Sequence, residues 1–206
     1  MGDQAPVKRS RRATRERLLD AASEVFGDRG LAASTVEDVC ERAGFTRGAF
    51  YSNFASKEEL LLAVLDREEA RVLDRLSAAV ASAPKDGDLV ALVTERLFDL
   101  QPFGSANHGL RAELSLLSMR DPHLAAPYHA ARVAFRERFR PFLERALDGA
   151  GLRLTVDADD ALSTIEGLFE SSVREAMIAG ADPNAGDTLA RRMLPTLLRA
   201  MTRPRE

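Results

Sequence analysis

Residues 35–60 read TVEDVCERAGFTRGAFYSNFASKEEL, and this stretch decides the fold expected for the amino-terminal part of the chain. Thr35 followed three residues later by Asp38 is a helix-start pattern, because the hydroxyl can accept a first-turn amide and the carboxylate can reach back. Gly44 can end this short helix, since glycine has no Cβ to oppose a tight turn. Thr46 then caps a second short helix. Two short helices joined in this way predict a helix-turn-helix, whose second helix would enter the major groove of DNA.

The segments on both sides of this motif also have apolar residues at helical spacing. One helix is expected at about 14–28 and a long helix at about 56–83. Five further helices are expected, with ends that the sequence defines less sharply, at about 88–100, 107–119, 127–149, 158–179 and 186–202. Residues 152–156 alternate like a strand, but a single short strand has no partner, so a loop is predicted there. The expected fold class is all-α.

Composition and charge exclude several classes of protein. Of the 206 residues, 45% are apolar and 30% are charged, which is typical of a globular protein rather than a disordered one. The net charge of −3 argues against a protein that coats nucleic acid without selectivity, although residues 1–17 carry six basic and two acidic side chains. The longest apolar run, Leu60 to Leu65, is too short to cross a membrane, and no apolar segment follows the basic amino terminus as in a signal peptide.

The cysteine content is typical of an intracellular protein. With Cys40 as its single cysteine, the chain cannot form an internal disulfide or a multi-cysteine metal site. We therefore expect a cytoplasmic protein that holds no metal and no cofactor, with a buried, structural thiol at Cys40.

About 50 residues, from Thr14 to Asp66, resemble the TetR family of transcriptional regulators. The matching features are Phe26 and Gly30 at the end of the first helix, Thr35-Val36 at the start of the second, the run AGFTRGAFYSNF at 43–54, and KEEL at 57–60. Two positions depart from the family pattern without disturbing it: Cys40 stands where alanine is usual, and Thr46 where serine is common. The rest of the chain agrees with the family only in length and helical character.

The resemblance implies three parts: a basic flexible arm at 1–13, a helix-turn-helix DNA-binding domain at 14–57, and a ligand-binding and dimerisation domain at 58–206. Basic residues between Lys8 and Arg17 are expected to add phosphate or minor-groove contacts. Disorder of this arm in the free protein is the alternative.

Nine residues are predicted to contact DNA or to place the reading helix on it: Thr35, Thr46, Arg47, Gly48, Ala49, Tyr51, Ser52, Asn53 and Lys57. The planar guanidinium of Arg47 can bind a guanine edge through two hydrogen bonds, and Gly48 and Ala49 are small enough for the backbone to approach the bases. By the resemblance, Tyr51 donates to a phosphate, and the ammonium of Lys57 binds another. A solvated Arg47, a Tyr51 packed in the core and an exposed Lys57 remain open as alternatives.

Two apolar stripes near the carboxyl terminus are predicted to form the homodimer interface, by the resemblance and by their helical spacing. The first lies in 162–177 and the second in 189–201. Packing within one subunit is the alternative.

The middle helices are expected to enclose a small-molecule effector. The candidate pocket residues are apolar or aromatic, with one histidine and one glutamate among them: Phe98, Phe103, His108, Leu110, Glu113, Leu114, Leu117, Phe135, Phe139 and Phe169. Ordinary core packing is the alternative for each apolar residue.

The predicted function is a sequence-specific regulator of transcription, a repressor that an apolar or amphipathic ligand releases from a near-palindromic double-stranded DNA operator. A DNA-binding regulator without a ligand is the alternative. An enzyme is not expected, because the sequence offers no nucleophile with a suitable base, no phosphate-binding loop and no metal-binding run. No membrane partner is expected.

Overall fold

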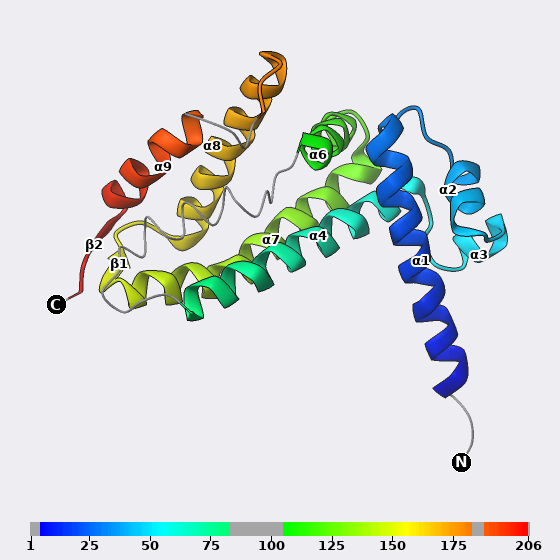
Figure 1. Cartoon of the computed structure of the whole chain (residues 1–206), viewed down its shortest axis with the longest axis horizontal. Coiled ribbons are helices and arrows are strands. Elements are labelled where there is room, and N and C mark those ends of the chain that lie inside the picture. Colours follow the sequence, from blue (N-terminus) through cyan, green and yellow to red (C-terminus); the bar gives the residue numbers. More distant parts are fainter. Residues whose placement is uncertain (1–4, 83–104, 183–187, 206) are drawn as a thin grey trace. The chain divides into compact units, whose positions relative to one another are not determined.

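The computed structural model describes residues 5–82, 105–182 and 188–205 (Figure 1). The described elements run in the order α1 (Ala5–Arg29), α2 (Val36–Ala43), α3 (Arg47–Tyr51), α4 (Lys57–Ala81), α6 (Ser105–Ser118), α7 (Pro122–Gly149), β1 (Leu152–Leu154), α8 (Ala158–Ile178), α9 (Leu189–Ala200) and β2 (Thr202–Pro204). The predicted all-α class is confirmed. The helix expected at 88–100 and the candidate pocket residues Phe98 and Phe103 lie outside the described residues.

The chain divides into two compact units. The first contains the chain up to Arg67 together with Gly109–His129, and the second contains Glu68–His108 and Ala130–Glu206. Residues of α4, α6 and α7 therefore occur in both units. The first unit thus includes part of α6 in addition to the helix-turn-helix.

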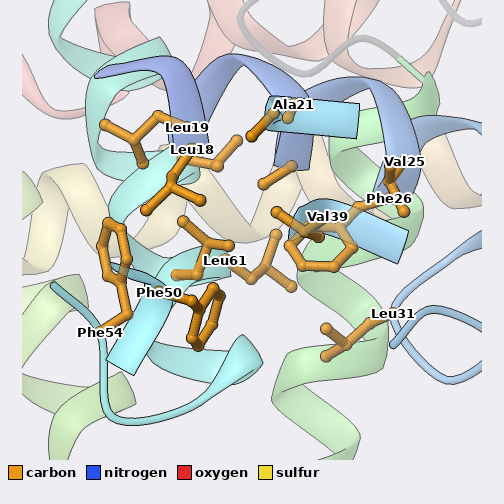
Figure 2. Close-up of a cluster of buried hydrophobic side chains, with 14 of the residues drawn as sticks. Leu18, Leu19, Ala21, Val25, Phe26, Leu31, Val39, Phe50, Phe54 and Leu61 are labelled. Carbon is orange, nitrogen blue, oxygen red and sulfur yellow. The ribbon is translucent and has the colours of Figure 1, made fainter. Parts of the chain in front are cut away.

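The core of the first unit is built from α1 to α4 and α6. Phe26, Phe50 and Phe54 are buried almost completely, and Figure 2 shows them facing the leucines of α1 and Leu61 of α4. Leu110 and Leu114, both on α6, belong to the same cluster. Burying each such large side chain stabilises the fold by about 1.5–3 kcal/mol, so this cluster fixes how the short helices α2 and α3 sit on α1 and α4.

The second unit has an apolar core and an ionic network of three helices. Leu76 of α4, Phe142 of α7, Phe169 of α8 and Leu194 of α9 share the core. The largely buried guanidinium of Arg132 on α7 pairs with Glu69 of α4 at 2.8 Å and with Glu166 of α8. A buried charge needs such partners, because burying one alone is unfavourable.

The prediction of a loop at 152–156 was wrong, because β1 pairs with β2 in a two-stranded antiparallel sheet. The register places Leu152 opposite Pro204 and Leu154 opposite Thr202. The partner strand follows the last helix directly, far away in the sequence and without a periodic pattern of its own. The pattern of residues 152–156 alone therefore cannot indicate that this segment pairs with 202–204.

Two helices begin at least five residues earlier than predicted. The backbone of α1 is already helical at Ala5 rather than at residue 14. Helix α7 begins at Pro122 rather than near residue 127, because the side chain of Asp121 accepts a hydrogen bond from the His123 amide at 2.8 Å. Aspartate before proline is a helix start, since proline suits the first helical position. Asp121 and Pro122 therefore begin α7.

None of the helices within the described residues combines the length and the apolarity that crossing a membrane requires. Cys40 is buried in the first core, as predicted, and burial raises the pKa of its thiol.

Candidate nucleic-acid interface

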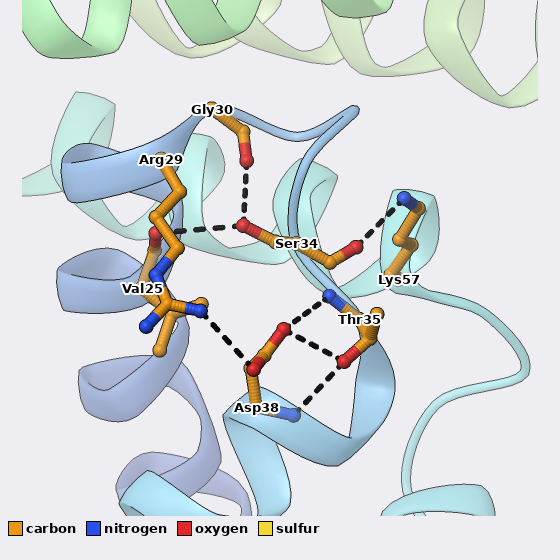
Figure 3. A network of polar contacts seen from close by, with 7 residues as sticks. All are labelled: Val25, Arg29, Gly30, Ser34, Thr35, Asp38 and Lys57. Atoms are coloured by element: carbon orange, nitrogen blue, oxygen red, sulfur yellow. Dashed lines mark hydrogen bonds and ion pairs between the residues drawn. The ribbon is translucent and has the colours of Figure 1, made fainter.

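The start of α2 is fixed by a reciprocal pair of hydrogen bonds, shown in Figure 3. The Thr35 amide donates to the Asp38 carboxylate at 2.8 Å, and the Asp38 amide donates to the Thr35 hydroxyl oxygen at 3.1 Å. Arg29 of α1 adds an ion pair to Asp38 at 3.2 Å. The predicted capping box is confirmed, and the ion pair with Arg29 ties the first turn of α2 to the end of α1.

Replacing Asp38 with asparagine is expected to destabilise the protein at neutral pH and to matter less in acid. The hydrogen bonds from Thr35 hold the pKa of Asp38 below its ordinary value of 3.8, so the folded protein takes up this proton less readily than the unfolded chain. The carboxylate therefore contributes stability above about pH 4, and this contribution disappears as the pH falls through the lower folded-state pKa. Thermal unfolding of both proteins along a pH series measures it. A Tm difference that does not shrink in acid contradicts the explanation.

The turn between α2 and α3 has the geometry that the sequence predicts. Gly44 ends α2 at a φ of 69°, in the left-handed region that favours glycine. The side chain of Thr46 then caps α3 by accepting a hydrogen bond from the Ala49 amide at 3.3 Å. Both predictions are confirmed, and together they set the direction in which α3 leaves the turn.

Helix α3 has one buried face and one exposed face. Phe50 is 0% exposed and anchors the helix, while its neighbour Tyr51 is 50% exposed. Arg47 and Gly48 are exposed with it, whereas Ala49 is half-buried. The outward face therefore offers the hydrogen-bond donors of Arg47 and Tyr51. Gly48, which has no side chain, lets the backbone come close, and both features suit contact with base edges and phosphates.

Two of the polar residues after Phe50 already bind backbone carbonyls of α3. The Ser52 hydroxyl donates to the Gly48 carbonyl and the Asn53 amide group to the Ala49 carbonyl, each at 2.8 Å. A DNA contact from either would have to share or replace these bonds. Their role in DNA binding stays a prediction.

Arg47 has two partners within the protein. Its guanidinium forms an ion pair with Glu37 of α2 at 2.9 Å and lies 5.9 Å from the ring centre of Tyr51. A hydrogen bond with Tyr51, and then the charge of Glu37, raise the pKa of Arg47. Sequence reasoning missed this pair, although acidic and basic side chains on adjoining short helices are a signal worth testing.

Lys57 holds the loop between α1 and α2, here defined as Gly30–Ser34. Its ammonium donates to the carbonyl oxygens of Leu31 at 2.8 Å and Ser34 at 2.9 Å; Figure 3 shows the second bond. An ammonium has three N–H donors, so one remains for a phosphate. The structure thus adds a positioning role that the sequence did not predict.

Glu113 of α6 holds the same loop by binding its backbone amides, whereas Lys57 binds its carbonyl oxygens. The carboxylate accepts hydrogen bonds from the amides of Leu31 at 2.8 Å and Ala32 at 3.1 Å. The sequence placed Glu113 among the candidate pocket residues, but in the structure this residue positions the loop that precedes α2. Leu110 and Leu114 lie in the adjoining core, which accounts for both without a ligand.

Replacing Glu113 with alanine is expected to destabilise the first unit, because the amides of Leu31 and Ala32 lose their acceptor. The loss is about 1 kcal/mol, the low end for unpaired amides, since the site is partly solvated. Glu113→Gln keeps an acceptor oxygen and should lose less. Urea unfolding of the three proteins, with amide hydrogen exchange at Leu31 and Ala32, measures both effects. Equal stability of all three would show that the loop does not depend on this carboxylate.

The other candidate pocket residues fall in both units. His108, Phe135, Phe139 and Phe169 belong to the second unit, and the partly exposed Leu117 belongs to the first. Phe135 and Phe139 contact each other with ring centres 5.6 Å apart. Their role in ligand binding stays a prediction.

Three arginines of α1 donate to backbone carbonyls of the helix-turn-helix. Arg11 reaches the Ser52 carbonyl at 2.8 Å, and Arg17 reaches the Ala43 carbonyl at 2.7 Å. Arg15 donates to the residue after Ser52 in the same way. Cations are favourable at helix carboxyl ends, so these side chains hold the ends of α2 and α3. Basic residues that were expected to contact only DNA thus also shape the interface.

Comparison with known proteins identifies related sequences. Residues 18–64 match the family described as "Bacterial regulatory proteins, tetR family". The HTH-type transcriptional activator FasR of Mycolicibacterium smegmatis is 32% identical over 140 residues, which cover 65% of this chain and 63% of FasR. The HTH-type transcriptional repressor AcnR of Corynebacterium efficiens is 27% identical over 184 residues, covering 78% of this chain and 93% of AcnR.

Coverage is partial for some of these relatives. The chain spans less than two thirds of the length of FasR, and 56% of the HTH-type regulator UidR of Escherichia coli. Among solved structures, Salmonella enterica GusR has a TM-score of 0.61 at 24% identity, covering 91% of this chain and 96% of GusR. The reduced form of E. coli NemR has a TM-score of 0.62 at 18% identity, covering 94% of this chain and all of NemR. At these identities, the structures establish a shared fold.

Proposed function

We propose that this chain, whose residues 18–64 match the tetR family, is a TetR-family regulator that binds a near-palindromic DNA operator in the cytoplasm and represses transcription there. The observation that carries the proposal is the two-faced helix α3. Buried Phe50 anchors the helix, and capped neighbouring turns orient it, while Arg47, Gly48 and Tyr51 remain exposed. An exposed, rigidly held helix end of this kind is what the major groove admits.

The proposed contacts divide into base reading and phosphate binding. Arg47 reads a base edge from the first turn of α3, where Gly48 lets the backbone approach. Tyr51 and the remaining N–H of Lys57 bind phosphates, and the exposed Thr35 lies at the amino end of α2, where a phosphate is favoured. Because each neutralised phosphate releases counterions, the affinity should fall steeply as salt is added.

We further propose that the protein acts as a homodimer through α8 and α9. Several predicted interface residues are already used in the core of the second unit, among them Phe169 and Leu194. Met177 and Ile178 of α8 and Met193 of α9 are nevertheless exposed, at 39%, 81% and 43%. These side chains give the two helices apolar surface for a second copy, and a two-fold dimer matches a near-palindromic site.

The proposed effector is a small apolar or amphipathic molecule bound in the carboxyl-terminal helical part. Phe135 and Phe139 on α7 are only partly buried, with ring centres 5.6 Å apart, and this pair supports an apolar ligand. The effector regulates only if it binds the DNA-competent and released states with different affinity.

The direct test is binding of the full chain to the promoter next to its own gene. We expect selective retardation of that duplex over a shuffled one, weakening with salt, and a dimeric mass in analytical ultracentrifugation. Release by a compound from a panel of apolar and amphipathic molecules supports the effector. If no compound releases the DNA, a regulator without a ligand remains. A reporter gene then distinguishes repression, as named for AcnR, from activation, as named for FasR. Absence of any sequence preference would refute the proposal.

A further inference from the structure

The exposed face of α3 has its cation already paired in the free protein. Arg47 is the single charged residue in the α3 sequence RGAFY. Its guanidinium contacts the carboxylate of Glu37 at 2.9 Å, and both side chains are more than half exposed, at 63% and 57%. Exposed pairs of this kind add little to folding stability. A role in the stability of the fold therefore does not account for the pair.

The position of Glu37 follows from the start of α2. Asp38 is occupied by the capping box and by Arg29 of α1. Successive residues of a helix point about 100° apart, so the residue before Asp38 points in a different direction. In the structure that direction brings Glu37 to Arg47, and the same cap that fixes α2 fixes the carboxylate.

We propose that Glu37 is a specificity-determining residue of the DNA interface, which holds Arg47 ready for a base edge and opposes its binding to phosphate alone. The inference rests on the proposed DNA-binding function. In this proposal Glu37 does not itself attract DNA. It increases the preference of Arg47 for a base edge over a phosphate.

The donor geometry of arginine explains the first half of this role. A guanidinium has five N–H donors in a fixed plane. Arg47 uses one of its nitrogens, Nη1, to pair with the Glu37 carboxylate. Donors remain for the two acceptors of a guanine edge, so a base contact can be added while the pair with Glu37 persists. A side chain already held in place also loses less freedom when it binds.

Charge explains the second half. A phosphate that approaches Arg47 meets a cation whose charge is already balanced by Glu37, and it also meets the carboxylate itself. Replacing one anion by another gives little net attraction, and like charges repel. Sequence-independent binding is dominated by phosphate contacts, so Glu37 weakens that mode more than the base-reading mode.

The test begins with selection of bound duplexes from random DNA by the wild-type full chain. Fluorescence anisotropy then gives Kd for the selected duplex and for a shuffled one over a salt series. For Glu37→Gln we expect binding to shuffled DNA to tighten about threefold to tenfold and the salt slope to steepen by up to about one phosphate per subunit. The ratio of the Kd for shuffled DNA to the Kd for the selected duplex should therefore fall by at least about threefold.

The matched control is Glu41→Gln. Glu41 is an exposed carboxylate one turn further along α2, and the described ion pairs include none between it and Arg47. This variant removes the same charge, so it should tighten both Kd values alike and leave their ratio unchanged. Pairing Glu37→Gln with Arg47→Ala completes a double-mutant cycle, in which Glu37→Gln should no longer change the ratio.

The outcomes separate this inference from the proposed function. If the wild type shows no sequence preference, the DNA-binding proposal itself fails. If the wild type is selective and Glu37→Gln keeps its Kd ratio, or lowers it equally when Arg47 is alanine, the role assigned to Glu37 is wrong. Circular dichroism of each variant verifies that the helices are intact.

Discussion

Replacing Arg47 with alanine is expected to remove most of the preference for the selected operator. A bidentate arginine–guanine contact contributes about 1–3 kcal/mol of discrimination, and a dimer has two copies, so the loss is about 30-fold to 10⁴-fold in affinity. Binding to shuffled DNA should change far less, because Arg47 is balanced by Glu37 in the free protein. Anisotropy titrations with both duplexes measure the two effects.

The control for Arg47→Ala is Arg42→Ala. Arg42 is also an exposed arginine paired with a carboxylate, that of Glu24, but it lies on the last turn of α2 and pairs with α1. Its removal should reduce affinity for both duplexes to the same small extent. Equal enrichment of one motif by wild type and Arg47→Ala would show that Arg47 does not read a base.

Replacing Phe50 with alanine is expected to have the largest effect on stability. The ring is 0% exposed and contacts the rings of Tyr51 and Phe54, with centres 5.2 and 6.0 Å away. Removing a buried phenylalanine costs about 3–5 kcal/mol through lost burial and the cavity left behind. That is a large part of the stability of a small unit, so α3 should lose its anchor and DNA binding should fall with it.

Urea unfolding followed by circular dichroism measures this loss, and Phe50→Leu is the control. Leucine fills most of the same space without a polar group, so its loss should be clearly smaller. A change below about 1 kcal/mol for Phe50→Ala would mean that the core relaxes around the vacancy and that Phe50 is not the anchor.

The parts of the fold that the sequence predicted depend on near neighbours. The capping box at Thr35, the left-handed turn at Gly44 and the cap at Thr46 each involve atoms no more than about one helical turn apart. The apolar spacing that predicts α1 and α4 is equally local. Such signals are complete within a short window, and the structure confirms them.

The contacts that the sequence did not predict join distant residues. Lys57 reaches a carbonyl 26 positions earlier, and Glu113 reaches an amide 82 positions earlier. A long ammonium or carboxylate side chain can bind any backbone group within reach, and nothing in its neighbours indicates which. The sequence suggested bound partners, DNA and an effector, for these two residues. Their role in holding the α1–α2 loop emerges only when α4 and α6 are packed against it.

The sequence by itself determined that a helix-turn-helix exists here, where its helices start and stop, and that Arg47 stands at the front of the second one. Only the tertiary structure decided that Glu37 pairs with this arginine, that β1 pairs with β2, and that α6 supports the loop before α2. The physical reason is range. Caps and periodicity act along a few residues of one chain segment, whereas ion pairs, strand pairs and core contacts depend on which segments packing brings together.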